Sequence, residues 1–367
     1  MFSDFQGNAE VVHRIREILA RDRFPHAVIL AGPNGAGKFT LAQMVAKTMN
    51  CLERPRTNGL PDFCGHCSNC TRIALADDLA SRCAEAVEAR ENLRETDRKE
   101  TRILVQTHPD VLIIPPDPPQ MTIKIDQVRR VIEGVYYRPT EGRHRVYIFA
   151  GSAFMKEAAN ALLKLLEEPP EFATIFLLVE NAGQLLPTIR SRCIAFTLGA
   201  LTTEQLEEDL ASYRKEWTPK QRALVARLAE GAIGRARSFD IEAYSAARTD
   251  ALTILQSAIS AGDHAPLFRA TETYRAGAEG QEKTSRLIRA TYSLLQDLLF
   301  LSSGTPEFVR NTDILVDLRR LSAMVDFRWL LAASDRLGEV ESGMRRNLLR
   351  SLSLDAFAAA LEQTKAG

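Results

Sequence analysis

Short apolar runs alternate with helical patterns along the first 199 residues of the chain. The runs lack the strict alternation of a half-exposed strand, as expected for a parallel sheet that is covered on both faces. They are Ala27–Ala31, Val111–Ile114, Val146–Phe149, Ile175–Val179 and Ile194–Phe196. We therefore predict an α/β domain with a parallel sheet over residues 1–199.

Helices between these strands are predicted from apolar residues that recur at helical spacing. The clearest pattern runs over Met155–Glu168, where Ala158 and Leu162 share a face and Pro169-Pro170 ends the helix. Asp126 precedes another such pattern and is a predicted N-cap, because its carboxylate can accept from a free backbone N–H.

Strand patterns stop at Leu201. Residues 200–240 contain short helical patterns, and residues 241–367 contain several amphipathic helices, including Ser285–Leu301 and Phe327–Leu337. This order predicts a small helical domain followed by an all-α bundle.

A glycine-rich loop separates the first predicted strand from a helical pattern over Leu41–Met49. It reads Gly32-Pro33-Asn34-Gly35-Ala36-Gly37-Lys38. In this context backbone N–H groups and a lysine bind phosphates at a helix N-terminus. The candidate nucleotide-binding residues are therefore Gly32, Gly35, Gly37 and Lys38. Retention of the loop as a tight turn without nucleotide stays open as the alternative.

The residues that would hold Mg²⁺ at this loop are missing. The position after the lysine calls for a Ser or Thr hydroxyl, but the chain has Phe39, and Thr40 comes one residue late. A hard cation requires oxygen ligands, which a phenyl ring cannot supply.

The acidic partner of such a loop is missing as well. A P-loop NTPase needs a carboxylate at the end of a later buried strand, but Val146–Phe149 is followed by Ala150-Gly151-Ser152. Glu180 follows another predicted strand, at a position that usually carries a polar phosphate sensor. We predict that the chain keeps the fold of an ATPase and lacks hydrolysis on its own.

Four of the six cysteines form a cluster with metal-ligand spacing: Cys51, Cys64, Cys67 and Cys70. Four thiolates make a closed tetrahedral site of the structural kind, so residues 51–70 are predicted to form a zinc module. His66 lies inside the cluster and is a weaker candidate ligand. An iron–sulfur cluster stays open from spacing alone.

Residues from about 74 to 102 differ in character from the rest of the first domain. The stretch Arg90–Glu100 is nearly all charged and consists of helix-forming residues of alternating sign. We predict a helical surface insertion. A docking arm for a partner is the alternative.

Charge and hydropathy narrow the class of protein. Lys plus Arg and Asp plus Glu balance at 47 each, so no strong overall field attracts nucleic acid. The first residues, Met1–Phe5, contain no basic and apolar leader, and no apolar run approaches the ~20 residues of a membrane span. We expect a cytoplasmic protein.

Several motifs together resemble the bacterial clamp-loader family of AAA+ proteins. They are Ala158–Pro170, Leu186–Cys193, His108-Pro109-Asp110, the opening Phe5-Gln6-Gly7-Asn8 and the cysteine cluster after the phosphate loop. They span about residues 2–240 in the family's order, and their combination is far more specific than the loop alone. One departure is that a longer stretch than the family's separates Cys70 from His108.

The resemblance implies an AAA+ domain, a helical lid over 200–240 and a collar domain over 241–367. The family's motor subunit carries an intact loop and an acidic pair, which this chain lacks. The resemblance therefore implies a non-hydrolysing stator subunit that supplies Arg192 in trans, as an arginine finger, to ATP on a neighbouring subunit. Arg235 falls near the family's second nucleotide sensor. The alternative is an active clamp-loader ATPase with Thr40 in the metal position.

The same resemblance implies partners and cofactors. The partners would be gamma/tau and delta subunits in a hetero-pentamer of DNA polymerase III, with the sliding clamp and primer–template DNA reached through the complex. DNA contacts would go to phosphates without base readout. The implied cofactors are a structural Zn²⁺ and, as an open question, ATP or ADP at the phosphate loop.

Overall fold

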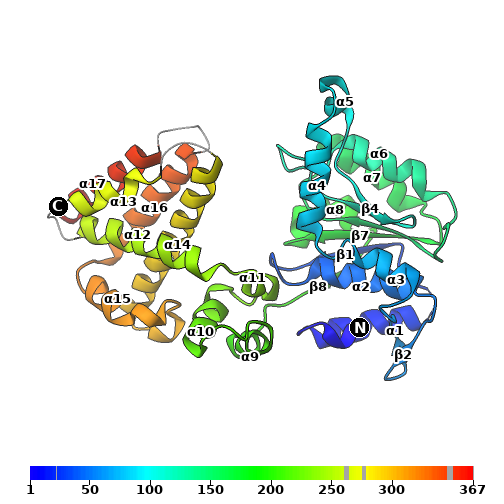
Figure 1. The fold of residues 1–367 in the computed structure, drawn as a ribbon, viewed down its shortest axis with the longest axis horizontal. Coiled ribbons are helices and arrows are strands. Elements are labelled where there is room, and N and C mark those ends of the chain that lie inside the picture. Colours follow the sequence, from blue (N-terminus) through cyan, green and yellow to red (C-terminus); the bar gives the residue numbers. More distant parts are fainter. Residues whose placement is uncertain (22, 260–263, 275–277, 345–349, 367) are drawn as a thin grey trace. The chain divides into compact units, whose positions relative to one another are not determined.

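The computed structural model describes residues 1–21, 23–259, 264–274, 278–344 and 350–366. The chain divides into two compact units (Figure 1). Unit 1 comprises Met1–Gln205 with Gly231–Arg235, and unit 2 comprises Leu206–Glu230 with Ala236–Gly367. The separate lid predicted over residues 200–240 stays a prediction.

Unit 1 is built on a six-stranded sheet in the order β4-β5-β6-β7-β1-β8. Its strands are β1 (Ala27–Ala31), β4 (Val105–His108), β5 (Val111–Ile114), β6 (Arg145–Phe149), β7 (Ala173–Val179) and β8 (Ile194–Thr197). Neighbours from β5 to β8 pair in parallel, which confirms the predicted parallel core. The edge strand β4 is antiparallel to β5 and was not predicted, because it is only four residues long and has neither a continuous apolar run nor a regular alternation.

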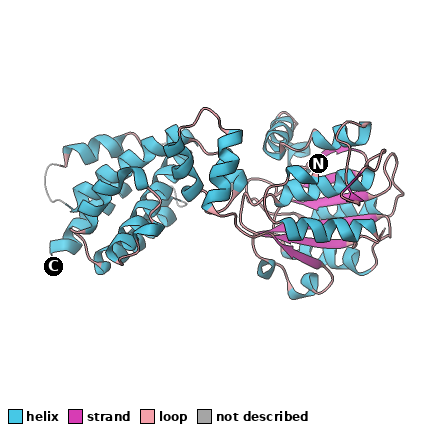
Figure 2. Cartoon of the chain, turned by 90° about the horizontal axis from the view of Figure 1, so that it is seen from below, coloured by secondary structure: helices cyan, strands magenta, loops and turns pink. Residues whose placement is uncertain are grey.

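Helices cover both faces of this sheet (Figures 1 and 2). Those on one face are α1 (Ala9–Ala20), α2 (Lys38–Asn50) and α3 (Ser68–Ala74), and those on the other are α6 (Ile125–Val135) and α7 (Lys156–Glu167). Alternate residues of β1 enter opposite cores: Val28 and Leu30 belong to the first, and Ile29 belongs to the second. This two-sided burial explains why the strand reads as a continuous apolar run.

The N-cap of α6 lies two residues before the predicted one. Asp126 lies in the first turn of the helix and is not its N-cap. The cap position is Lys124, whose backbone N–H donates to Oε1 of Gln127 at 2.9 Å. The buried amide of Gln127 therefore fixes the helix start, which the pattern of apolar residues could not reveal.

The charged insertion forms two helices, α4 (Leu79–Glu91) and α5 (Glu95–Glu100). No residue of α4 is buried. Near its end, Nη1 of Arg90 lies 3.0 Å from Oδ1 of Asp117, a fully buried carboxylate that also lies 3.1 Å from Nζ of Lys124. One buried cluster of charges thus ties the end of α4 to the sheet domain.

The chain from residue 201 onward is helical, and its described part contains no strand, as predicted. The helices are α9 (Thr203–Tyr213), α10 (Pro219–Leu228), α11 (Ile233–Arg237), α12 (Ile241–Ile259), α13 (Ala265–Glu272), α14 (Ala278–Ser302), α15 (Leu315–Ser322), α16 (Phe327–Met344) and α17 (Arg350–Ala366). The core of unit 2 lies among α12 to α17, where buried Trp329 donates its indole N–H to the carbonyl of Leu361 at 3.2 Å. None of the described helices is both long and apolar enough to cross a lipid bilayer.

Candidate functional site

The glycine-rich loop lies where β1 ends and α2 begins, at the carboxyl end of the parallel strands. The backbone N–H of Gly32 donates to the carbonyls of Val179 and Glu180 at 3.2 and 3.1 Å. A Cβ atom at Gly32 would lie 2.7 Å from the carbonyl oxygen of Leu198, so the close approach of the strands requires glycine there. Gly37 caps α2 with a left-handed φ of 88°.

Lys38 turns back onto its own loop. Its Nζ donates to the carbonyl oxygens of Gly32 and Pro33 at 2.5 and 2.8 Å. Burial lowers the pKa of Lys38, and the nearby charge of Glu180 opposes that shift. Glu180 in turn accepts a hydrogen bond from the side-chain amide of Asn34. The ammonium of Lys38 and the carboxylate of Glu180 are therefore both engaged by the loop itself.

The residues after Lys38 do not present oxygen ligands at the loop in the way a magnesium site requires. Phe39 is half-buried and packs against the first core, whereas Thr40 is exposed. Successive helical residues are about 100° apart around the axis, so Thr40 does not replace residue 39 by a small shift. The segment that follows β6, residues 150–152, carries no carboxylate.

The segment Gly231–Arg235, which belongs to unit 1 although it follows Gln205 in the chain by 25 residues or more, packs on the phosphate loop. The N–H of Gly234 donates to the carbonyl of Gly35 at 2.8 Å, and a Cβ at Gly35 would lie 2.9 Å from the backbone nitrogen of Arg235. The fold thus brings two of the predicted nucleotide-site residues, Gly35 and Arg235, into contact through their backbones.

Arg192 lies between the short helix α8 (Pro187–Arg190) and β8. Its Nη1 donates to the carbonyl of Thr188 and its Nη2 donates to Oε1 of Glu167, both at 2.9 Å. The Arg192 side chain keeps 35% of its surface exposed. The guanidinium is therefore held from two sides and still accessible.

Arg192 and the phosphate loop occupy opposite ends of the sheet. Strands β1 and β8 are parallel neighbours in which Val28 lies opposite Ile194. Arg192 precedes β8, whereas Gly32 follows the end of β1. The length of the strands, roughly 15 Å, separates the two at about 3.3 Å per residue, which exceeds the reach of an arginine side chain.

The four clustered cysteines come together at the end of α2. Their Sγ atoms all lie within 4.8 Å of one another, and all four thiols are free of disulfides. Backbone N–H groups point at the sulfurs: that of Cys64 donates to Cys51 at 3.4 Å, and that of Cys67 donates to Cys64 at 3.3 Å. Cys51 and Cys70 are buried and Cys64 and Cys67 are half-buried, and such a set of hydrogen-bonded thiols fits a tetrahedral metal such as zinc.

The thiols of the cluster differ in acidity. Burial alone would raise the pKa of Cys67, but hydrogen bonds, chiefly from backbone N–H groups, outweigh it and lower the pKa to about 7. Burial raises the pKa values of Cys64 and Cys70. His66 is exposed and lies 3.3 Å from Glu53, so it competes poorly with the four sulfurs for a closed site.

Comparison with known proteins identifies the family. Residues 7–78 and 74–202 match the family described as DNA polymerase III, delta subunit. The chain belongs to this clamp-loader family. It is 30% identical over 267 residues to DNA polymerase III subunit tau of Escherichia coli, a match that covers 71% of this chain and 33% of that protein.

The relatives of this clamp-loader chain include a second subunit type. This chain is 31% identical over 175 residues to DNA polymerase III subunit delta' of Pseudomonas aeruginosa, and the match covers 47% of this chain and 43% of that protein. The chain thus spans about a third of the tau relative and under half of the delta' relative, and identity does not separate the two types. A solved gamma subunit-related protein of Thermotoga maritima aligns over 96% of this chain and 99% of that chain at 17% identity, with a TM-score of 0.39 that is too low to carry an argument.

Two polar residues that the sequence analysis missed fasten the cysteine module of this clamp-loader chain. Buried Arg16 of α1 donates to the carbonyls of three residues in the ribbon of β2 (Arg56–Thr57) and β3 (Leu60–Pro61), at 2.7 to 3.0 Å. Asn50, the last residue of α2, accepts from the N–H groups of Arg143 and His144 through its side chain. Neither signal is visible locally, because the partners lie far along the chain.

The motif His108-Pro109-Asp110 has a structural role. The carboxylate of Asp110 accepts from the backbone N–H groups of Thr140, Glu141 and Gly142 at 2.7 to 2.9 Å. Burial would raise the pKa of Asp110, but these three donors outweigh it and lower the pKa. The motif therefore holds the loop that enters β6.

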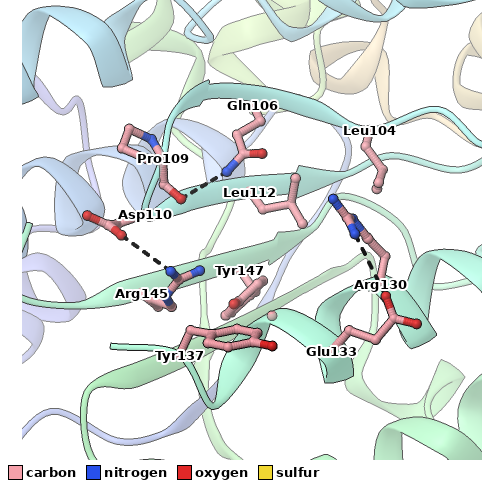
Figure 3. Close-up of a pocket in the computed structure, with 11 residues that line it drawn as sticks. Leu104, Gln106, Pro109, Asp110, Leu112, Arg130, Glu133, Tyr137, Arg145 and Tyr147 are labelled. Atoms are coloured by element: carbon pink, nitrogen blue, oxygen red, sulfur yellow. Dashed lines mark hydrogen bonds and ion pairs between the residues drawn. The ribbon is translucent and has the colours of Figure 1, made fainter. Parts of the chain in front are cut away.

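A cavity of about 710 Å³ lies beside β4, β5, β6 and α6 (Figure 3). Figure 3 shows that its charges pair with one another: Arg145 with Asp110, and Arg130 with Glu133. The cavity contains none of the site residues predicted from the sequence, and we assign no ligand to it.

Proposed function

We propose that this chain is the delta-prime, stator-type subunit of the DNA polymerase III clamp loader. In this role it hydrolyses no ATP by itself. It supplies Arg192 in trans to ATP bound on an adjacent gamma/tau-type motor subunit, while the assembled complex loads the sliding clamp onto primer–template DNA during replication.

The placement of Arg192 carries this proposal. The guanidinium lies at the amino end of the strands, roughly 15 Å from the chain's own phosphate loop, and is accessible. An arginine that stabilises the charge of a transferring phosphoryl group must reach that group, so a catalytic Arg192 would serve a nucleotide held by another chain.

The composition and contacts of the phosphate loop also support a subunit that does not hydrolyse ATP itself. Phe39 takes the place of the metal-binding hydroxyl, no carboxylate follows β6, and Lys38 donates to the loop's own carbonyls. The retained Lys38 favours one alternative, an active gamma/tau-like ATPase. That alternative needs Mg²⁺ ligands that neither Thr40 nor residues 150–152 offer.

The cysteine module completes the proposal as a structural element. A Zn²⁺ ion on Cys51, Cys64, Cys67 and Cys70 would join the end of α2 to α3, because these thiols come from both segments. Such a closed site would brace the amino end of the sheet, the end that also carries Arg192. Arg235 would lie at the loop as part of the lid contact.

The test uses the chain assembled with delta- and gamma/tau-type subunits. Co-purification with measured stoichiometry should give one copy of this chain per complex. Arg192→Ala should leave the complex intact and lower DNA-stimulated ATP turnover by roughly 10³-fold. Arg190→Ala is the matched control, since this exposed arginine lies two residues away and removes the same charge.

Two outcomes would contradict the proposal. One is unchanged turnover of the complex with Arg192→Ala. The other is steady ATP turnover by the isolated chain that disappears with Lys38→Ala, which would establish the gamma/tau-like alternative.

A further inference from the structure

The partner of Arg192 within its own chain points to a residue with a role of its own. Glu167 is the last residue of α7, and its Oε1 accepts from Nη2 of Arg192 at 2.9 Å. The carbonyl of Thr188 accepts from Nη1 at the same distance. These two acceptors come from different segments, so together they restrict the direction of the guanidinium as well as its position.

We propose that Glu167 is a positioning residue for the arginine finger, which orients Arg192 toward the nucleotide of the neighbouring subunit. This inference rests on the proposed function of Arg192. A guanidinium has five N–H donors in one plane. Thr188 and, at 3.5 Å, Oγ of Ser191 accept from Nη1, and Glu167 accepts from Nη2, so the Nε–H and the second N–H of Nη2 stay available for phosphate oxygens.

The physical reason is the cost of ordering a long side chain. A free arginine side chain samples many rotamers, and it loses this conformational entropy when the guanidinium contacts the transferring phosphoryl group. A guanidinium that is already fixed by two hydrogen bonds avoids most of that loss at the moment of reaction. The pair is too exposed to matter much for folding, with 35% of the Arg192 side chain and 52% of the Glu167 side chain accessible.

The structure fixes Glu167 in place while leaving its neighbour outside the contact. Leu165 and Leu166 are buried in the second core, and residues 169–170 end the helix directly afterwards. Glu168 is exposed, and its side chain makes no hydrogen bond or ion pair among the residues that the structure describes. Glu168→Ala therefore removes the same charge from the same surface without touching Arg192.

The experiment measures ATP turnover of the assembled complex as a function of ATP concentration for a set of variants. Glu167→Ala should lower kcat roughly three- to ten-fold and leave KM for ATP unchanged, because the residue touches no substrate. Glu167→Gln should restore most of kcat, since an amide oxygen can still accept from Nη2. Glu168→Ala should behave as wild type. Glu167→Ala added to Arg192→Ala should cause no further loss.

The alternatives give distinct results. If Glu167 instead weakens the finger by neutralising its charge, both Glu167→Ala and Glu167→Gln will raise kcat, which overturns the inference. Equal losses in Glu167→Ala and Glu168→Ala overturn it as well, because the effect then follows surface charge. If Arg192→Ala lowers turnover and Glu167→Ala does not, only this inference fails. If Arg192→Ala has no effect, the proposed function itself fails.

Discussion

The two ends of the parallel sheet in unit 1 differ in how their polar residues are used. At the carboxyl end, the phosphate loop directs its own lysine back to the carbonyls of Gly32 and Pro33. At the amino end, Arg192 is held in the open by Glu167 and Thr188. The lysine at the carboxyl end is thus bound to its own loop, whereas the arginine at the amino end remains accessible.

Under the proposed function, this contrast corresponds to a fold that keeps one half of a shared chemical site and has lost the other. In the proposed complex each ATP needs a phosphate loop from one chain and an arginine from the next. A chain at the end of such a series needs only the arginine, so substitutions such as Phe39 are tolerated at its own loop. In the proposed complex the amino end would require rigidity, to which the cysteine module and the loop held by Asp110 would contribute.

The largest effect on the stability of the chain is expected from removal of the metal at the amino end of the sheet. Cys67→Ser should reduce bound zinc from about one ion per chain to little or none, because a closed site needs all four thiolates. The loss should lower the melting midpoint of the chain by roughly 10 °C, since binding energy at such a site is folding energy. Metal content and thermal unfolding measure the outcome.

Cys83→Ser serves as the control for the metal prediction. Cys83 is a half-buried free thiol outside the cluster, so this variant should retain its zinc and most of its stability. Full metal content and unchanged melting in Cys67→Ser would show that the cluster does not bind zinc with four thiolates.

A smaller effect is expected at the loop that enters β6. Asp110→Asn should lower the free energy of unfolding by about 2 kcal/mol at pH 7, because a buried carboxylate with three backbone donors loses its charge. The pKa of Asp110 is lowered from its ordinary value of 3.8. The stability it contributes is therefore fully present above that value and is lost as pH falls through the lowered pKa of the folded state.

Urea unfolding at several pH values tests this dependence. The difference between wild type and Asp110→Asn should be constant from pH 7 to about pH 5 and shrink below about pH 4. Asp126 on α6 is a half-exposed carboxylate that pairs with Arg102 and Arg129, so Asp126→Asn should show a much smaller difference throughout. A stability difference between wild type and Asp110→Asn that grows as the pH falls would contradict the stabilising role assigned to the Asp110 carboxylate.

The smallest effect on stability is expected from a substitution in the phosphate loop, at the carboxyl end of the sheet. Lys38→Ala should change the free energy of unfolding by less than about 1 kcal/mol, because the two carbonyls that it leaves can be hydrated at the loop surface. Turnover by the assembled complex should stay within about a factor of two of wild type. A tenfold fall would mean that this loop holds a nucleotide that the complex needs.

Some features were predictable because they depend on near neighbours in the chain. Each strand of the parallel core is an uninterrupted apolar run, since residues such as Ile29 and Leu30 enter opposite cores. The metal spacing of the cysteines is equally local, with three of the four thiols within seven residues of one another. The edge strand β4 and the start of α6 were missed or misplaced, because an antiparallel partner and the buried amide of Gln127 decide them.

The amino-acid sequence by itself determined the strands of the parallel core, the phosphate loop with Phe39 after its lysine, and the four-cysteine spacing. Only the tertiary structure decided that Arg192 lies at the far end of the sheet from that loop and that Glu167 holds it, because strand pairing and helix packing join residues that are distant in the chain. The same holds for Arg16 and Asp110, whose partners lie 30 or more residues away. A local pattern specifies an element, whereas the register between elements specifies which side chains meet.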